Sequence, residues 1–332
     1  MLIRKSDFYC IRDKLLDGVL ANKLAGLSRG LSHFTRLQAH WDEKATENTF
    51  ERVRLFSEIP QVRRRICQQY GGKNVVQWIF ETFLRGRNGL KVASVGCGTG
   101  NAELELAKYG GSETFFSIIG FDPSNVSIQV ANDRVAEAGF DGFLNFKFGT
   151  IDQPPPALLE ESLDVVFAFS SLHHLTNLRR NVGLMRRWLK PGGLLIAHEY
   201  IGPTRQQYSH AEVDLINSLF AVLPEKFRRD WHTGRVRRGV PIPGALLMYL
   251  YDPSEMVESS DILPAIRNNF QTVNLHVELG TLLLCLLKEI GHNFPDGETD
   301  AELIINYLCD IELSLLSSGM LKPHFGTIVA HN

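Results

Sequence analysis

One short glycine-rich segment of this chain has the composition of a ligand cradle. Residues 96–100 (GCGTG) follow the apolar run 91–95 and precede an amphipathic segment that starts at Ala102. Glycine lets the backbone turn sharply, and it exposes backbone amides that a Cβ atom would shield from a ligand. A helix start adds oriented N–H groups and the positive end of a dipole. Asn101 stands where the dinucleotide fingerprint G-x-G-x-x-G needs its third glycine, so the pattern favours another nucleotide-like ligand. An ordinary structural turn is the alternative.

Carboxylates follow the next two predicted strands. The apolar run 115–121 ends at Asp122, and the run 144–149 is followed closely by Asp152. An acidic side chain at the end of the second strand can accept hydrogen bonds from both hydroxyls of a ribose. Asp152 is placed to accept the exocyclic amine of an adenine, or it only caps the next turn. Together with the glycine turn, these acids predict an adenosine-containing cofactor.

Polar side chains that could act on a substrate follow the fourth and fifth predicted strands. The run 163–169 leads into His173 and His174, and the run 194–200 ends in three polar residues. A histidine titrates near pH ~6.5 and is a ready base at neutral pH. Each of these side chains could instead bond the backbone and only shape the pocket wall. The catalytic candidates are His174, His173, Glu199 and Tyr200, and the substrate-binding candidates are Arg205, Gln206 and His198. No metal is expected, because no Asp/His cluster with ligand spacing is visible.

The alternation of strands and helices predicts the fold class. Strands separated by helical segments form a parallel sheet covered on both faces, and ligands bind at the carboxyl ends of its strands. We therefore expect a doubly wound, Rossmann-like α/β fold.

The ordered set VASVGCGTG, GFDPS, FGTID, LDVVFAFSSLHHL and LKPGGLLIAHEYIGP resembles the class I S-adenosylmethionine-dependent methyltransferases over residues 88–202. The resemblance implies a seven-stranded sheet, S-adenosyl-L-methionine as cofactor and S-adenosyl-L-homocysteine as product. The segments EYIGPTRQQYS, LPEKFRRD and YDPSEMV are similar to a mostly uncharacterised bacterial subfamily that is often associated with glycan or secondary-metabolite pathways.

The implied function is methyl transfer to a small molecule or glycan intermediate, with oxygen favoured and nitrogen or carbon left open. A protein or RNA methyltransferase and a catalytically idle S-adenosylmethionine-binding scaffold are the alternatives. The expected cofactor-binding residues are Gly96, Cys97, Gly98, Gly100, Asp122, Pro123, Thr150, Ile151, Asp152, Phe169, Ser170 and, from the N-terminal region, Trp41.

Four regions are predicted along the chain. A helical lid covers residues 1–87, and the cofactor-binding α/β core covers 88–202. A helical cap follows over 203–269, with helices expected over 204–223 and 254–269 and a basic loop over 225–243. Residues 270–332 supply the last two strands of the sheet with a helical insertion between them. Within that insertion the apolar run 282–287 is interpreted as core, with a dimer surface as the alternative.

Composition favours a cytoplasmic enzyme. The formal net charge of −2 over 332 residues gives no global attraction to nucleic acid, and no nucleic-acid partner is expected. The five cysteines are scattered without a C-x-x-C pair, which favours a reducing compartment. No run approaches the ~20 apolar residues of a membrane span, and the N-terminus does not resemble a signal peptide. A homodimer is left open.

Overall fold

The computed structural model describes residue 42 and residues 54–332. The predicted lid over 1–87 is therefore described only in its second part, and Trp41 lies outside the described residues. The described part of this region is mainly helical between residues 60 and 84, as predicted. It contains α4 (Pro60–Gln69), α5 (Val75–Ile79) and the π-helical segment Phe80–Leu84.

Seven strands form one sheet in the order β3-β2-β1-β4-β5-β7-β6. Only β7 runs antiparallel to its neighbours, β5 and β6. The strands are β1 (Leu90–Val95), β2 (Phe115–Asp122), β3 (Leu144–Phe148), β4 (Leu163–Phe169), β5 (Leu189–Tyr200), β6 (Thr272–Val277) and β7 (Phe325–His331). The predicted doubly wound, seven-stranded fold is confirmed. β5 starts earlier than expected, because Leu189 already pairs with Leu163 before the Pro-Gly-Gly segment.

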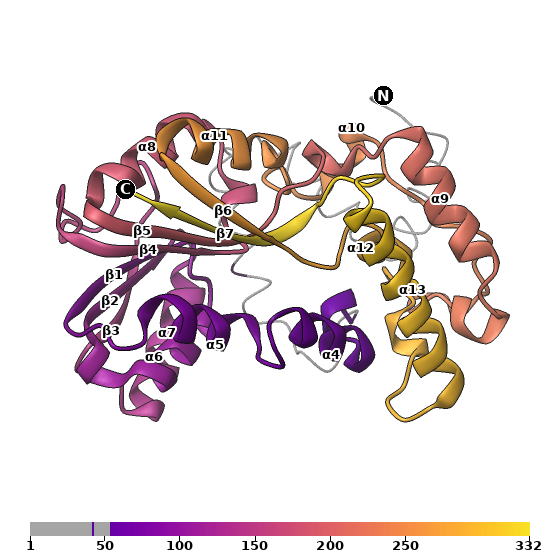
Figure 1. The fold of residues 1–332 in the computed structure, drawn as a ribbon, viewed down its shortest axis with the longest axis horizontal. Helices are drawn as coiled ribbons and strands as arrows, with labels where there is room; N and C mark the ends of the chain where they lie inside the picture. The colour runs from indigo at the N-terminus through magenta and orange to yellow at the C-terminus, as the bar shows by residue number, and fades with distance from the viewer. Residues whose placement is uncertain (1–41, 43–53) are drawn as a thin grey trace.

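Helices cover both faces of the sheet (Figure 1). On one face lie α5, α6 (Asn101–Thr114) and α7 (Asn125–Ala138); on the other lie α8 (Leu178–Trp188) and α11 (Ile262–Asn269). The alternation of side chains along β5 shows why two layers are needed. Leu194 and Ile196 join the hydrophobic cluster beneath α5 and α6, whereas Leu195 and Ala197 join the cluster beneath α8 and α11.

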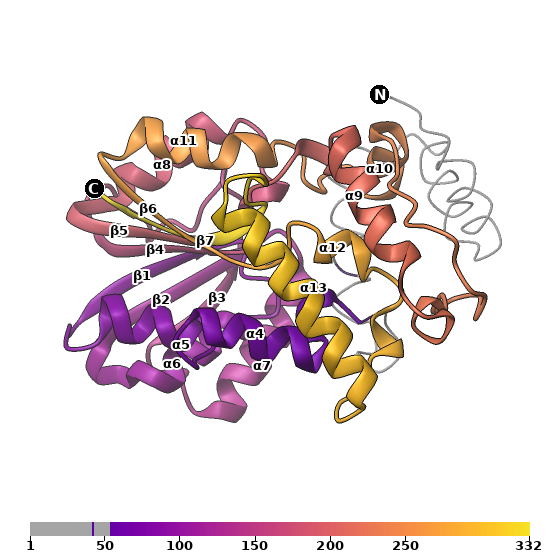
Figure 2. The same ribbon diagram turned by 45° about the vertical axis from the view of Figure 1, so that its right-hand side comes forward.

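A helical extension lies beyond the carboxyl ends of the parallel strands (Figures 1 and 2). It contains α9 (His210–Ala221), α10 (Ala245–Tyr251), α12 (Leu283–Leu286) and α13 (Thr299–Ser317). The run 282–287 packs inside this extension, with all but Leu284 buried, so the interpretation as core agrees with the structure. The buried Glu312 of α13 accepts hydrogen bonds from the four amides of residues 280–283, which holds α12 against α13.

Two boundaries in the cap differ from the expected helices. The segment expected as one helix over 204–223 is a short 3₁₀ turn, Thr204–Gln206, followed by α9. The segment 254–269 becomes helical only with the 3₁₀ turn Ser259–Asp261 and α11. Within the described residues, no helix has the length and apolar character needed to cross a bilayer.

Candidate functional site

A cavity of about 1170 Å³ opens where the parallel strands end. The turn after β1 and the ends of β2, β3 and β4 form one part of its wall. Residues of α4, α5, α6 and α7 also line it, as do His198 of β5, Ser254 and Glu278 after β6. The predicted position of the ligand site at this edge of the sheet is therefore matched by a cavity large enough for a ligand.

The glycine turn is shaped by backbone angles that favour glycine. Gly96, Gly98 and Gly100 have φ of 65°, 52° and 75°. A Cβ added at Gly98 would meet no atom within 4 Å, so it would project into open space beside the cavity. A Cβ at Gly100 would come within 2.5 Å of the Phe146 ring, so this glycine serves close packing and does not line the cavity. Gly98 is thus the position where a ligand can approach the backbone.

Asp122 connects this turn to the end of β2. One carboxylate oxygen accepts a hydrogen bond from the Gly98 amide at 3.0 Å, and the other accepts one from the Ser124 amide at 2.9 Å. Burial raises the pKa of Asp122, while the two amides act against that rise. Each oxygen keeps lone pairs for a further donor, and the residue lines the cavity.

Asp152 lies in the wall on the β3 side. Its carboxylate forms an ion pair with Arg180 of α8, and both side chains are more than half exposed. An exposed pair of this kind contributes little to stability, roughly 0–1 kcal/mol. The position is compatible with the predicted contact to an adenine.

Glu199 organises the loop after β4. It is fully buried, and one oxygen accepts the amides of Ser171 and Leu172 at 2.5 and 2.6 Å. The other oxygen lies 2.7 Å from Nδ1 of His173. Burial lowers the pKa of His173, but the charge and the hydrogen bond of Glu199 outweigh it, so the pKa is raised overall. Glu199 follows His198 by one residue in β5, so strand alternation turns it to the opposite face and away from the cavity.

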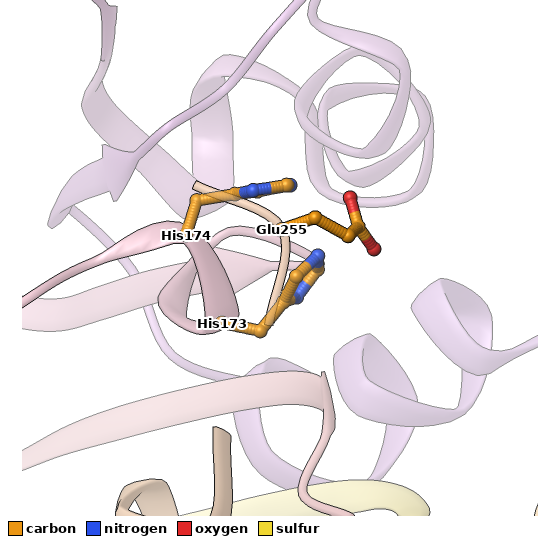
Figure 3. A group of neighbouring side chains, drawn as sticks. All are labelled: His173, His174 and Glu255. Atoms are coloured by element: carbon orange, nitrogen blue, oxygen red, sulfur yellow. The ribbon is translucent and has the colours of Figure 1, made fainter. Parts of the chain in front are cut away.

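His174 is the histidine of this loop that lines the cavity. Its Nδ1 lies 3.2 Å from Ser254 Oγ and 3.3 Å from the Ser254 carbonyl oxygen. Figure 3 shows that His173, His174 and Glu255 are neighbours. One potential metal-ligand atom of each lies within 4.8 Å of those of the other two. Two imidazoles and a carboxylate could hold a transition metal. The sequence did not predict this group, because Glu255 joins the histidines only through the fold; the expectation of no metal stays a prediction.

A second polar group lies on the far side of the cavity. Glu278 accepts a hydrogen bond from the Tyr70 hydroxyl at 2.8 Å, and that hydroxyl lies 2.9 Å from Thr327 Oγ1. Thr327 Oγ1 is 3.1 Å from Nδ1 of His198, whose ring stacks on Phe169 with centroids 4.5 Å apart. Burial lowers the pKa of His198 to about 3 and raises the pKa of Glu278 to about 7.

The predicted site residues divide into two groups. Those that line the cavity are Gly96, Cys97, Gly98, Asp122, Pro123, Thr150, Asp152, Phe169, Ser170, His174 and His198. Those that do not are Gly100, Ile151, His173, Glu199, Tyr200, Arg205 and Gln206.

Two residues of the second group, Tyr200 and Arg205, contact other parts of the protein outside the cavity wall. Tyr200 is buried and donates a hydrogen bond to the Pro203 carbonyl. The Arg205 guanidinium donates to the carbonyls of Asp252, Pro253 and Glu255, so it holds the loop that carries Ser254 and Glu255. In place of the predicted direct contacts, these side chains support the residues that face the cavity.

Sequence reasoning missed much of the cavity wall, including Arg63, Ser254 and Glu278. Of these three, only Glu278 had a signal: it is an acidic residue directly after the predicted sixth strand, at the edge where ligands bind.

Part of this chain is similar to known proteins. Residues 93–197 match the family model described as a methyltransferase domain. A sterol 24-C-methyltransferase of Gibberella zeae is 30% identical over 115 residues, which cover 35% of this chain and 29% of that protein. A ubiquinone biosynthesis O-methyltransferase of Brucella anthropi is 25% identical over 169 residues, 50% of this chain and 60% of that protein. A 27-O-demethylrifamycin SV methyltransferase of Amycolatopsis mediterranei is 28% identical over 116 residues, 35% of this chain and 40% of that protein.

A solved structure shares the fold. The phosphoethanolamine N-methyltransferase 2 of Haemonchus contortus, in complex with S-adenosyl-L-methionine, superposes with a TM-score of 0.51 at 16% identity. The superposition covers 91% of this chain and 60% of that chain. The three curated relatives are matched over less than two thirds of their length.

The seven-stranded sheet, with β7 antiparallel and a cavity at the end of β1, is a doubly wound α/β domain. Residues 93–197 match a methyltransferase domain, and the sheet has the fold of the class I S-adenosylmethionine-dependent methyltransferases.

Proposed function

We propose that this chain transfers a methyl group from S-adenosyl-L-methionine to a small molecule, with a hydroxyl oxygen as the favoured acceptor. The observation that carries this proposal is the cavity, whose two halves have different chemistry. The half at β1, β2 and β3 combines the open Gly98 with the carboxylates of Asp122 and Asp152. The half at α4, α5 and β5 is apolar around a few polar groups.

The first half fits an adenosyl sulfonium. Gly98 leaves the space that a cofactor needs, Asp122 retains acceptor capacity for ribose hydroxyls, and Asp152 can accept from the adenine amine. These residues bind and orient the donor, which itself supplies an activated methyl group. Alignment of acceptor, methyl carbon and sulfur in a dry pocket then accounts for most of the rate acceleration.

The second half fits a compact and largely apolar acceptor. Ile66, Cys67, Val75 and Val76 lie in this part of the wall. The curated relatives are named for small-molecule pathways, including sterol methylation and ubiquinone biosynthesis.

A macromolecular substrate is disfavoured by charge. Among the described residues of the wall, Arg63 is the only arginine or lysine. In the basic loop of the cap, Lys226 pairs with Glu298 and Asp300, and Arg237 with Glu289. RNA binding needs unpaired cations along a groove, and the described part of the chain presents no such groove at this cavity.

Labelled methyl transfer tests the proposal. The full chain is incubated with tritium-methyl S-adenosylmethionine and a cell extract that has been divided by size into small-molecule and macromolecular fractions. We expect label in the small-molecule fraction. Label confined to protein or RNA would support the macromolecular alternative, and cofactor binding without transfer to either fraction would support the idle scaffold.

A further inference from the structure

The carboxylate of Glu278 faces the cavity from the side opposite the predicted cofactor residues. It directly follows β6, is 2% exposed and lines the cavity. Its Oε2 accepts the hydrogen bond from Tyr70, and its backbone amide donates to the Phe325 carbonyl. Within the described residues, Oε1 forms no hydrogen bond. A carboxylate oxygen that opens to the cavity and has no protein partner can accept a hydrogen bond from a ligand.

The strand order shows which ligand Glu278 would meet. Asp122 ends β2 and Asp152 follows β3, both on one side of β1. The strands β5, β7 and β6 lie on the other side, beyond β4. Phe169 at the end of β4 stacks on His198 of β5. In the strand order, β4 and β5 lie between β1, which carries the glycine turn, and β6, which Glu278 follows. A donor held by the glycine turn and the two aspartates therefore leaves Glu278 to the acceptor.

We propose that Oε1 of Glu278 binds the hydroxyl group of the methyl acceptor and takes its proton during transfer, which makes it a catalytic residue. This inference rests on the proposed function. In the step, a bond forms between the acceptor oxygen and the methyl carbon while the bond from that carbon to the donor sulfur breaks. The sulfur keeps the electron pair of the broken bond, and the hydroxyl proton passes to Oε1 and later to solvent.

The surroundings of Glu278 suit a base near neutral pH. Among the described residues, the titratable groups that face it are Tyr70, which directly follows α4, and His198 of β5, whose Nδ1 lies 3.8 Å from Oε2. Burial raises the pKa of Tyr70 and lowers the pKa of His198 to about 3, so both are neutral around pH 7. Burial raises the pKa of Glu278 itself to about 7, close to the working pH at which a general base is most effective.

A hydroxyl acceptor fits this place better than a charged amine. A protonated amine would bring positive charge next to a sulfonium donor and to the exposed Arg63 of the wall. A neutral hydroxyl brings no such repulsion, and its oxygen gains nucleophilic character as the proton moves to the carboxylate.

Two variants test this role. Glu278→Gln keeps the size of the side chain but cannot take a proton, so kcat should fall by ~10²-fold or more, while the Kd for S-adenosylmethionine stays within about threefold of wild type. The rise of kcat/KM with pH near pH 7 should vanish in this variant. Tyr70→Phe removes a hydrogen bond that lowers the pKa of Glu278. The Tyr70→Phe variant should remain active, and the pH at which its kcat/KM rises should be higher than in the wild type.

The probe is tritium-methyl S-adenosylmethionine with the small-molecule fraction of the extract, and the product is examined by mass spectrometry. Methyl label on oxygen with both variant effects would support the inference. Unchanged kcat in Glu278→Gln, or label on nitrogen or carbon, would overturn it and leave the proposed function standing. A wild-type chain that transfers no label would instead contradict the proposed function itself.

Discussion

The amide of Gly98 donates a hydrogen bond to the carboxylate of Asp122 over 3.0 Å, although the two residues are 24 positions apart. This contact joins the glycine turn after β1 to the last residue of β2. Because the second carboxylate oxygen accepts from Ser124, the side chain is fixed in orientation before any ligand arrives. One carboxylate thus shapes the cradle and presents its remaining lone pairs to the cavity.

Asp122→Asn should weaken cofactor binding without unfolding the chain. The asparagine side chain has one acceptor oxygen where aspartate has two. Either the glycine turn or the ribose therefore loses a charge-assisted hydrogen bond of ~1.5–3 kcal/mol. We expect the Kd for S-adenosylmethionine to rise by about 10- to 100-fold in calorimetry. Asp133→Asn is the control, because Asp133 is an exposed residue of α7 outside the cavity wall. An equal loss of affinity in the control would contradict a specific role for Asp122.

Glu199→Gln should destabilise the loop after β4. The buried carboxylate accepts three hydrogen bonds, and glutamine replaces one of its two acceptor oxygens by a donor. We expect the free energy of unfolding in urea to fall by about 3 kcal/mol, and the amides of residues 171–174 to exchange faster with deuterium. Glu160→Gln serves as control, since Glu160 is exposed and only pairs with Arg187. Unchanged stability in Glu199→Gln would show that these contacts do not hold the loop.

Glu103 should make stability depend on pH. Burial raises the pKa of this side chain from 4.5 to about 7, although Ser94 donates a hydrogen bond to it. A carboxyl group with a raised pKa stabilises the fold below its unfolded pKa, and that contribution is lost as the pH rises through the folded pKa. Between pH ~4.5 and ~7 the wild type should lose about 3 kcal/mol from this group.

The measurement is a series of urea unfolding curves against pH for wild type and Glu103→Gln. The difference between the two proteins isolates Glu103 from other titrating groups, and it should shift in favour of the variant as the pH rises. A difference that does not change with pH would mean that Glu103 titrates normally.

The parts of the site that sequence predicted are encoded locally. The turn after β1, Asp122 and Asp152 each follow an apolar run directly, so their place at the end of a strand can be inferred from adjacent residues. The order of strands followed from the resemblance of the motifs, and the cavity formed where that order places it.

The remaining parts depend on contacts between distant segments. Glu278 meets Tyr70 across 208 positions, and Ser254 meets His174 across 80. No local pattern reports such pairs. Tyr200 and Glu199 were expected at the site because they end a strand, but strand alternation turns Glu199 to the opposite face, and Tyr200 packs against His324.

Calorimetric binding of S-adenosylmethionine to the full chain, to Gly98→Ala and to Gly139→Ala tests the central claim most directly. Both glycines have positive φ and no atom within 4 Å of an added Cβ, but Gly139 ends α7 and lies outside the cavity wall. Each substitution should therefore cost a similar backbone strain, roughly 1–2 kcal/mol. We expect one cofactor bound per wild-type chain, similar binding by Gly139→Ala, and an affinity at least about tenfold weaker in Gly98→Ala. A folded wild-type chain that binds no S-adenosylmethionine, or equal binding by both variants, would contradict the assignment of this cavity to the cofactor.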